Sequence, residues 1–310
     1  MKKKIFIDGK AGTTGLRIEE RLSGRDDVEI ISLPEELRKD TDARREILNK
    51  ADVVFLCLPD AAAKEAVSMI ENEDVVVIDA STAHRTNPDW AYGLPELSPE
   101  FEQKIKDSKR IAVPGCHASG FIALVYPLIK SGMLNPDALL SVHSITGYSG
   151  GGKSMIADYK SEERSELLCA PRQYALSQSH KHLPEMVKIT GLNNAPIFSP
   201  IVADFYSGME VTVPIFKSQL AYGGIEDIKK IYRELYTTPI LKYAEGSDEG
   251  GFLSAAALSD KDSMRIEVHG SDERILLIAR YDNLGKGASG AAVECLNIKL
   301  GCDRAKTLVL

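Results

Sequence analysis

The chain has 310 residues, of which 44% are hydrophobic, and a formal net charge of −7. This length supports a sizeable core in roughly two domains, and the negative charge without a long basic run excludes broad nucleic-acid binding. No apolar stretch reaches the ~20 residues of a membrane-spanning helix, and the lysines at 2–4 lead into a strand rather than a signal peptide. Five scattered cysteines without a CxxC pair predict a cytoplasmic protein that lacks a disulfide framework.

The first pattern in the chain is a strand, a glycine-rich turn and a helix. Residues 4–8 are an apolar strand, residues 9–15 contain three glycines spaced as GxxGxxG, and residues 16–22 are helix-like. Such a turn lets the backbone approach a pyrophosphate at the N-terminus of the helix. The turn residues that we expect to bind a dinucleotide are Gly9, Gly12, Thr13, Thr14 and Gly15.

The second strand, residues 28–33, predicts which dinucleotide is bound. An NAD site commonly has an acidic residue at the end of this strand, where it holds the ribose hydroxyls. This chain has Ser32 there, with Arg38 and Lys39 downstream. These residues favour NADP, because they can accommodate its 2′-phosphate. The alternative is that Arg38 and Lys39 simply form a solvated helix face.

Strands and helices continue to alternate up to residue 113. The apolar runs 51–58 and 75–79 are typical of parallel strands that are buried on both faces, and the alternation predicts a doubly wound parallel sheet of the Rossmann type. Ser81 follows the second run, so we expect it to line the cofactor crevice. Arg85 lies just beyond and is a candidate to bind an anionic substrate group, although such an arginine is more often structural.

A single cysteine stands where a strand gives way to a helix. Residues 111–113 are the expected strand, and Cys116 follows a Pro-Gly corner before the apolar run 121–134, which we interpret as a core helix with Gly132 near its end. Free N–H groups and the helix dipole favour an anion at this point. A thiol here is expected to ionise more easily than free cysteine (pKa ~8.5) and to act as a nucleophile beside the cofactor crevice. The alternative is a small buried residue that packs a helix start.

The second half of the chain has a different pattern. Period-two strands at 140–145, 197–202, 209–215, 264–269 and 275–281, with a helix at 225–235, predict an inserted α+β domain with a mainly antiparallel sheet. In one of these strands Met264, Ile266 and Val268 are expected to face the core, and Arg265, Glu267 and His269 the solvent. We expect residues 1–115 and 286–310 to form the cofactor domain and 116–285 the catalytic domain.

Two further clusters in this half carry chemistry. Residues 180–185, His-Lys-His-Leu-Pro-Glu, offer a histidine acid or base with Glu185 to orient it. Residues 147–154 match the P-loop spacing, but a flexible loop that presents Lys153 to an anionic substrate is the preferred interpretation. Zinc bound by Cys116 and the histidines at 117, 180 and 182 is a further alternative, although we expect no metal.

Together these residues resemble the N-acetyl-gamma-glutamyl-phosphate reductase family in its short form, over essentially the whole chain. The shared motifs are the glycine turn at 9–15, Tyr-Gly-Leu-Pro-Glu-Leu at 92–97, Pro-Gly-Cys at 114–116, HxHxPE at 180–185 and the run 283–290. Two places depart from the family pattern: His117 stands where a tyrosine is common, and residues 11–15 differ from the usual Gly-Tyr-Thr-Gly form.

The resemblance implies an activity and roles for several residues. It implies an NADPH-dependent reductase of arginine biosynthesis, with Cys116 as nucleophile, His180 rather than His182 as acid or base, and Asn283 among the cofactor-binding residues. A soluble homo-oligomer, dimer or tetramer, acting on a small acyl phosphate is expected. The alternatives are a related semialdehyde dehydrogenase that acts on another acyl phosphate and a non-catalytic NADP-sensing protein.

Overall fold

The computed structural model describes residues 2–38 and 40–310, so Lys39 lies outside the described residues. The chain forms two compact units. The first contains the residues up to Pro95, with Pro99–Pro114 and Ala288–Leu308, and the second contains Glu96–Ser98, Gly115–Gly287 and the last two residues. None of the helices in the described ranges is long and apolar enough to cross a membrane.

The first unit contains a six-stranded sheet in the order β2-β1-β3-β4-β6-β5, with every neighbouring pair parallel. The predicted doubly wound parallel sheet is therefore confirmed. Its strands are β1 Lys3–Asp8, β2 Val28–Ile31, β3 Val53–Leu56, β4 Val76–Asp79, β5 Ala91–Tyr92 and β6 Arg110–Ala112. Its helices are α1 Thr13–Leu22, α2 Thr41–Lys50, α3 Asp60–Ser68, α4 Pro99–Asp107 and α9 Gly290–Leu300.

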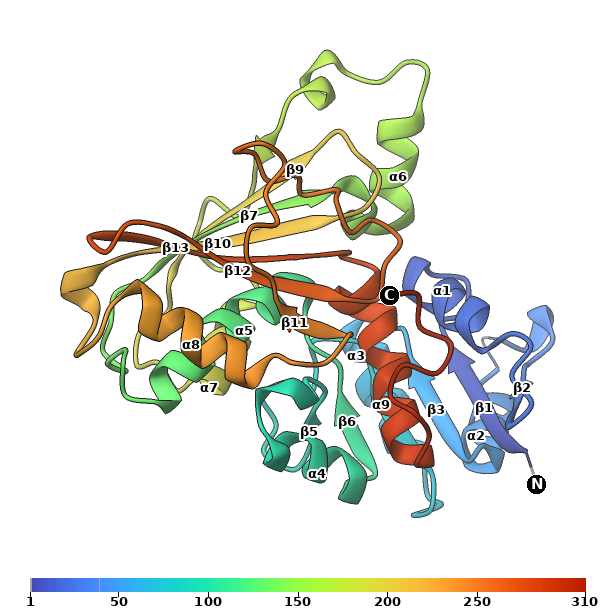
Figure 1. The fold of residues 1–310 in the computed structure, drawn as a ribbon. Coiled ribbons are helices and arrows are strands. Elements are labelled where there is room, and N and C mark those ends of the chain that lie inside the picture. The colour runs from blue at the N-terminus through green and yellow to red at the C-terminus, as the bar shows by residue number, and fades with distance from the viewer. Residues whose placement is uncertain (1, 39) are drawn as a thin grey trace. The chain divides into compact units, whose positions relative to one another are not determined.

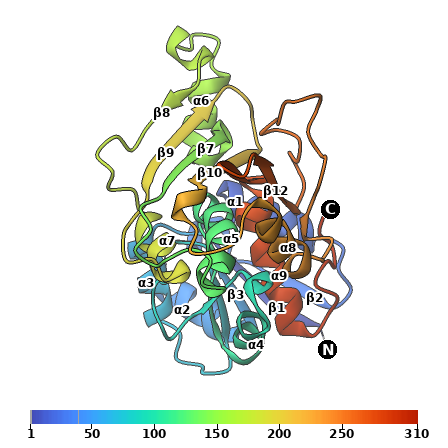
Figure 2. The same cartoon turned by 60° about the vertical axis from the view of Figure 1, so that its left-hand side comes forward.

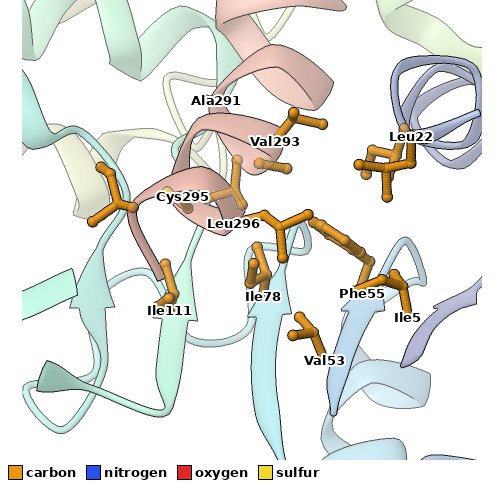
Figure 3. Packing of buried hydrophobic residues seen from close by; sticks show 14 of the residues in the cluster. Ile5, Leu22, Val53, Phe55, Ile78, Ile111, Ala291, Val293, Cys295 and Leu296 are labelled. Atoms are coloured by element: carbon orange, nitrogen blue, oxygen red, sulfur yellow. The ribbon is translucent and has the colours of Figure 1, made fainter. Parts of the chain in front are cut away.

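Helices cover both faces of this sheet, as its apolar strands require. Alternate residues of a strand point to opposite faces. Ile5 and Ile7 of β1 therefore join the core beneath α1 and α9, which Figure 3 shows around Phe55 and Leu296. Phe6 joins a separate cluster with residues of α2 and α3. The order of the strands reverses between β1 and β3, and ligands of such sheets bind at the carboxyl ends of the strands near this reversal.

The glycine turn adopts a backbone that other residues would not tolerate. Gly9 has a φ of +85°, and a Cβ there would lie 2.2 Å from the carbonyl oxygen of Cys57. A Cβ on Gly15 would lie 2.7 Å from the carbonyl oxygen of Gly9, so α1 packs directly onto the turn. The helix begins at Thr13, three residues before the predicted start at residue 16, because Gly12 already serves as its N-cap.

The second unit contains a seven-stranded sheet in the order β11-β12-β13-β10-β7-β9-β8. Its strands are β7 Ser141–Gly147, β8 Arg172–Gln173, β9 Ile197–Ala203, β10 Met209–Phe216, β11 Leu241–Tyr243, β12 Met264–Gly270 and β13 Arg274–Tyr281. Four neighbouring pairs are antiparallel, whereas β7 with β9 and β11 with β12 are parallel. The mainly antiparallel sheet was predicted, and the two parallel pairs were not.

The helices of this unit are α5 Cys116–Lys130, α6 Gly152–Lys160, α7 Leu183–Thr190 and α8 Ile225–Leu235. Helices α5 and α8 pack on the same face of the sheet (Figures 1 and 2). The predicted core helix α5 begins five residues earlier than residue 121, and Gly132, just beyond its end, has a left-handed φ of +76°. The predicted helix at 225–235 is confirmed as α8, which buries Ile228 and Tyr232 on one face.

The prediction that Glu267 faces solvent is wrong. Its side chain is fully buried and accepts hydrogen bonds from Nε and Nη2 of Arg280, at 2.9 and 2.8 Å. Arg280 also donates to Glu249 at 2.6 Å and to the carbonyl oxygen of Ser247 at 2.9 Å. The guanidinium thus links the 247–254 loop to the sheet, whereas Arg265 and His269, on the same face of β12, are only half-buried.

Candidate active site

Cys116 is the first residue of α5 and is half-buried, with Gly115 as the N-cap. The predicted position of the thiol at a helix N-terminus is therefore confirmed. Tyr281 of β13 bridges the first turn of the helix, since its hydroxyl donates to the carbonyl of Cys116 at 2.5 Å and accepts from the N–H of Gly120 at 3.0 Å. On another side a Cβ on Gly287 would lie 3.1 Å from that of Cys116. The backbone around the sulfur is thus held by two elements.

Glu185 connects the histidine segment to the Pro-Gly-Cys corner. Its carboxylate is buried in the first turn of α7 and accepts the N–H of Gly115 at 2.8 Å. The sequence hypothesis gave Glu185 the task of orienting a histidine, and it did not anticipate this contact across 70 positions. The bond places residues 114–116 and 180–185 in one site.

The histidines of that segment lie close together. The rings of His180 and His182 are 4.7 Å apart, and that of His117 lies 5.8 Å from the first and 5.6 Å from the second. Nδ1 of His180 accepts the backbone N–H of His182 at 3.1 Å, so the neutral ring carries its proton on Nε2. Burial, helped by the charge of Lys181, lowers the pKa of His180 to about 4, which keeps the ring neutral at pH 7.

His117 is the residue that sequence reasoning assigned least well. Its ring is 3% exposed and takes part in two hydrogen bonds, one between Nδ1 and the hydroxyl of Ser144 at 2.6 Å and one between Nε2 and the hydroxyl of Tyr174 at 2.7 Å. Burial, together with the nearby His180, lowers its pKa to about 3. Ser144 and Tyr174 were missed because they lie 27 and 57 positions away and belong to no recognisable motif.

A buried ion pair joins Glu96, in the motif at 92–97, to Lys286, in the glycine-rich motif at 283–290. Glu96 accepts from Nζ of Lys286 at 2.7 Å, and both side chains are almost completely shielded from solvent. The sequence pattern assigns no contact to Glu96, whose partner in the structure is Lys286. Lys286 lies in the π-helical turn Gly285–Ser289 and directly precedes Gly287, the residue that lies against Cβ of Cys116.

Gly9 and Ser32 line a cavity of about 220 Å³ at the carboxyl ends of β1, β2 and β3 in the first unit. Its other walls are Phe6, Ile7, Asp8, Lys10, Ala11, Leu33, Arg38 and Leu58. Gly12 and the first-turn residues Thr13, Thr14 and Gly15 continue from this wall into α1. Gly9 thus shares one cavity with Ser32 and Arg38, whereas Gly12, Thr13, Thr14 and Gly15 follow in the chain without being part of its lining.

Two other predicted cofactor residues have structural contacts. The hydroxyl of Ser81 donates to Asp79 at 2.7 Å, beside His84, which contacts the same carboxylate. Asn283 lies in the second unit, where it accepts the N–H of Gly208 at 2.9 Å and donates to Ser149 at 3.0 Å. Its amide therefore ties two loops together.

The predicted substrate residues differ in exposure. Arg85 is buried in the first unit, and its Nε and Nη2 donate to the carbonyls of Val113 at 2.8 Å and Ala80 at 3.0 Å. Lys153 is exposed in the first turn of α6 in the second unit. Within the described part of the chain, no group of three or more His, Cys, Asp or Glu residues is arranged to hold a metal ion, which the zinc alternative would require.

Comparison with known proteins identifies the family. The chain is 43% identical over 308 residues to the N-acetyl-gamma-glutamyl-phosphate reductase of Sinorhizobium medicae, covering 97% of this chain and 99% of that one. It is 44% identical over 309 residues to the enzyme of the same name from Brucella ovis, covering 97% and 100%. The chain belongs to the N-acetyl-gamma-glutamyl-phosphate reductase family.

The two halves of this reductase-family chain match separate family models. Residues 4–105 match the NAD binding domain of semialdehyde dehydrogenases, and residues 116–283 match the semialdehyde dehydrogenase dimerisation domain. Among solved structures, aspartate semialdehyde dehydrogenase II of Vibrio cholerae, complexed with ASA, has a TM-score of 0.75 at 16% identity, covering 97% of this chain and 99% of that one. The Candida albicans enzyme with NADP has a TM-score of 0.65 at 16% identity, covering 96% and 98%. These structures share the fold of the reductase-family chain.

Proposed function

We propose that this protein reduces N-acetyl-gamma-glutamyl phosphate to N-acetylglutamate semialdehyde with NADPH, the reaction named for its relatives in arginine biosynthesis. The observation that supports this most directly is the hydrogen bond from Gly115 to Glu185, because it unites the cysteine corner and the histidine segment in one site. A nucleophile at a helix start with neutral imidazoles beside it is suited to acyl transfer through sulfur.

The Cys116 thiolate attacks the acyl carbon, the bond from that carbon to the phosphate oxygen breaks, and phosphate leaves with its electron pair. NADPH, when bound, supplies the hydride that reduces the resulting thioester. Sulfur donates weakly into a carbonyl, so the thioester remains open to reduction. The carbon–sulfur bond then breaks to give the aldehyde and the thiolate. His180, with its proton on Nε2, is proposed as the acid and base that serves the oxygen of the tetrahedral intermediate. His182 is the alternative.

The reverse reaction tests this function. With N-acetylglutamate semialdehyde, NADP and inorganic phosphate, we expect NADP reduction that depends on phosphate, at least about tenfold faster in kcat/KM than with aspartate semialdehyde. The shared fold makes aspartate semialdehyde the natural competitor. A preference for that substrate would support the related dehydrogenase instead. No reduction of either, together with alkylation of Cys116 by iodoacetamide no faster than that of free cysteine, would support a sensor.

Cofactor choice is proposed to depend on the cavity beside Ser32 and Arg38, with the turn residues on the pyrophosphate. We expect Arg38→Ser to raise KM for NADPH about tenfold and to leave KM for NADH within about twofold, since only NADPH carries the 2′-phosphate. Steady-state kinetics with both cofactors measures this. Lys50→Ser, an exposed change at the end of α2 away from the cavity, is the control. An equal loss with both cofactors would contradict the assignment.

The other residues that the sequence predicted for the site keep their proposed roles. Arg85 and Lys153 are proposed to bind anionic substrate groups, and Ser81 and Asn283 to bind the cofactor. A homo-oligomer, dimer or tetramer, is proposed from the dimerisation-domain match. The sheet face opposite α5 supports it, because this face exposes apolar side chains. They are Ile197 of β9, Phe216 of β10 and Leu276 of β13.

We also propose a cytoplasmic location, which the five free cysteines support.

A further inference from the structure

Three side chains from separate elements form one line of hydrogen bonds beside the nucleophile. Ser144 lies in β7, His117 follows Cys116 in α5, and Tyr174 comes directly after β8. The hydroxyl of Ser144 is 2.6 Å from Nδ1 of His117, and Nε2 of the same ring is 2.7 Å from the hydroxyl of Tyr174. Which group donates in each hydrogen bond decides whether the hydroxyl hydrogen of Tyr174 is available to a substrate.

The direction is set at Ser144. This residue is completely buried, and within the described residues its hydroxyl has one partner, Nδ1 of His117. A buried hydroxyl hydrogen without an acceptor is costly, by roughly 1–3 kcal/mol. Ser144 therefore donates, and Nδ1 accepts. Burial keeps the imidazole of His117 neutral, so its single proton lies on Nε2 and is donated to the phenolic oxygen of Tyr174.

Tyr174 is consequently left with a hydroxyl hydrogen that does not point at His117. Burial, together with the charge of Cys116, raises the pKa of Tyr174 well above its usual value, so the hydroxyl stays protonated. The side chain is partly exposed, and its ring lies 6.0 Å from that of His180. The donor thus belongs to the same site as the nucleophile and the proposed acid.

We propose that Tyr174 is a catalytic hydrogen-bond donor to the acyl oxygen of the substrate as that oxygen becomes negative, with His117 and Ser144 as positioning residues. The proton stays on Tyr174 throughout, and no bond of the residue forms or breaks. The inference rests on the proposed function, since it needs a tetrahedral intermediate on Cys116. His117 suits the positioning role, because a neutral imidazole accepts a hydrogen bond at one ring nitrogen and donates one at the other.

The experiment compares Tyr174→Phe, Ser144→Ala and the double variant in the phosphate-dependent reverse assay. Tyr174→Phe is expected to lower kcat about 10²-fold with KM within about threefold, the loss typical of an oxyanion donor. Ser144→Ala frees Nδ1 to keep the proton, after which Tyr174 donates to His117 instead, so kcat should fall about tenfold. The double variant should be no slower than Tyr174→Phe alone, because Ser144 acts only through Tyr174.

The control is Tyr222→Phe, which removes an exposed hydroxyl that donates to the carbonyl of Ser131 at 2.9 Å and should leave kcat unchanged. Reaction of Cys116 with iodoacetamide should be as fast in Tyr174→Phe as in the unaltered protein. If the unaltered protein is active and Tyr174→Phe keeps more than half of its kcat, the inference fails alone. A double variant whose loss of kcat equals the product of the losses in the two single variants would also overturn the inference. An inactive unaltered protein would overturn the proposed function, and this inference with it.

Discussion

Replacing Cys116 with serine is expected to lower kcat at least about 10³-fold, while the Kd for NADPH stays within about twofold. A serine hydroxyl at the start of α5 remains protonated at neutral pH and is a far weaker nucleophile than a thiolate. The change removes no buried contact of the size of a core residue, since Cys116 is half-buried and the two side chains are similar in shape. Stopped-flow reduction and a fluorescence titration with NADPH measure the two quantities.

Cys169→Ser is the matched control, because this cysteine is exposed and lies in the short 3₁₀ turn Glu166–Cys169. It should retain full turnover. If Cys116→Ser kept more than about a tenth of the normal kcat, the thioester route would be excluded. Hydride would then have to be transferred directly to the acyl carbon of the acyl phosphate, and phosphate would leave afterwards.

Arg280→Leu is expected to destabilise the protein by about 3–5 kcal/mol. It leaves the carboxylate of Glu267 completely buried without the guanidinium that donates to it twice. It also releases Glu249 and the 247–254 loop from the sheet. Urea unfolding followed by circular dichroism measures the free energy of unfolding, and the midpoint should fall without a large change in the slope.

The double variant Arg280→Leu/Glu267→Leu separates the two causes of this loss. Its destabilisation should be smaller than that of Arg280→Leu alone, because no uncompensated charge remains in the interior. Arg274→Leu, an exposed change on the same strand, should alter the free energy of unfolding by no more than about 0.5 kcal/mol. A double variant that is less stable than Arg280→Leu would show that the pair contributes through packing rather than through charge compensation.

Local sequence was sufficient for the elements whose cause is local. The apolar runs at 51–58 and 75–79 predicted buried parallel strands, which the structure shows at 53–56 and 76–79, because a strand covered on both faces needs apolar residues at every position. The GxxGxxG turn and the Pro-Gly corner predicted helix starts, since glycine and proline restrict or permit particular backbone angles. The position of Cys116 at a helix N-terminus followed from that corner and the apolar run after it.

Local sequence was insufficient wherever a contact joins distant residues. The two-residue strands β5 and β8 exist only through hydrogen bonds to a neighbouring strand, and nothing in their own residues marks them. Glu267 was assigned to solvent because alternation describes one strand, whereas its burial depends on Arg280 from the next strand and a loop held over both.

The chemistry of the site divides in the same way. The sequence by itself determined the fold class, the position of the Cys116 thiol at a helix start and the cluster of histidines at 180–182, because each leaves a pattern within a few consecutive residues. Only the tertiary structure decided that Glu185 holds Gly115 and that Ser144, His117 and Tyr174 form a line of hydrogen bonds. Hydrogen-bond direction depends on which donors and acceptors are brought together and shielded from water, and this is a property of the packed chain.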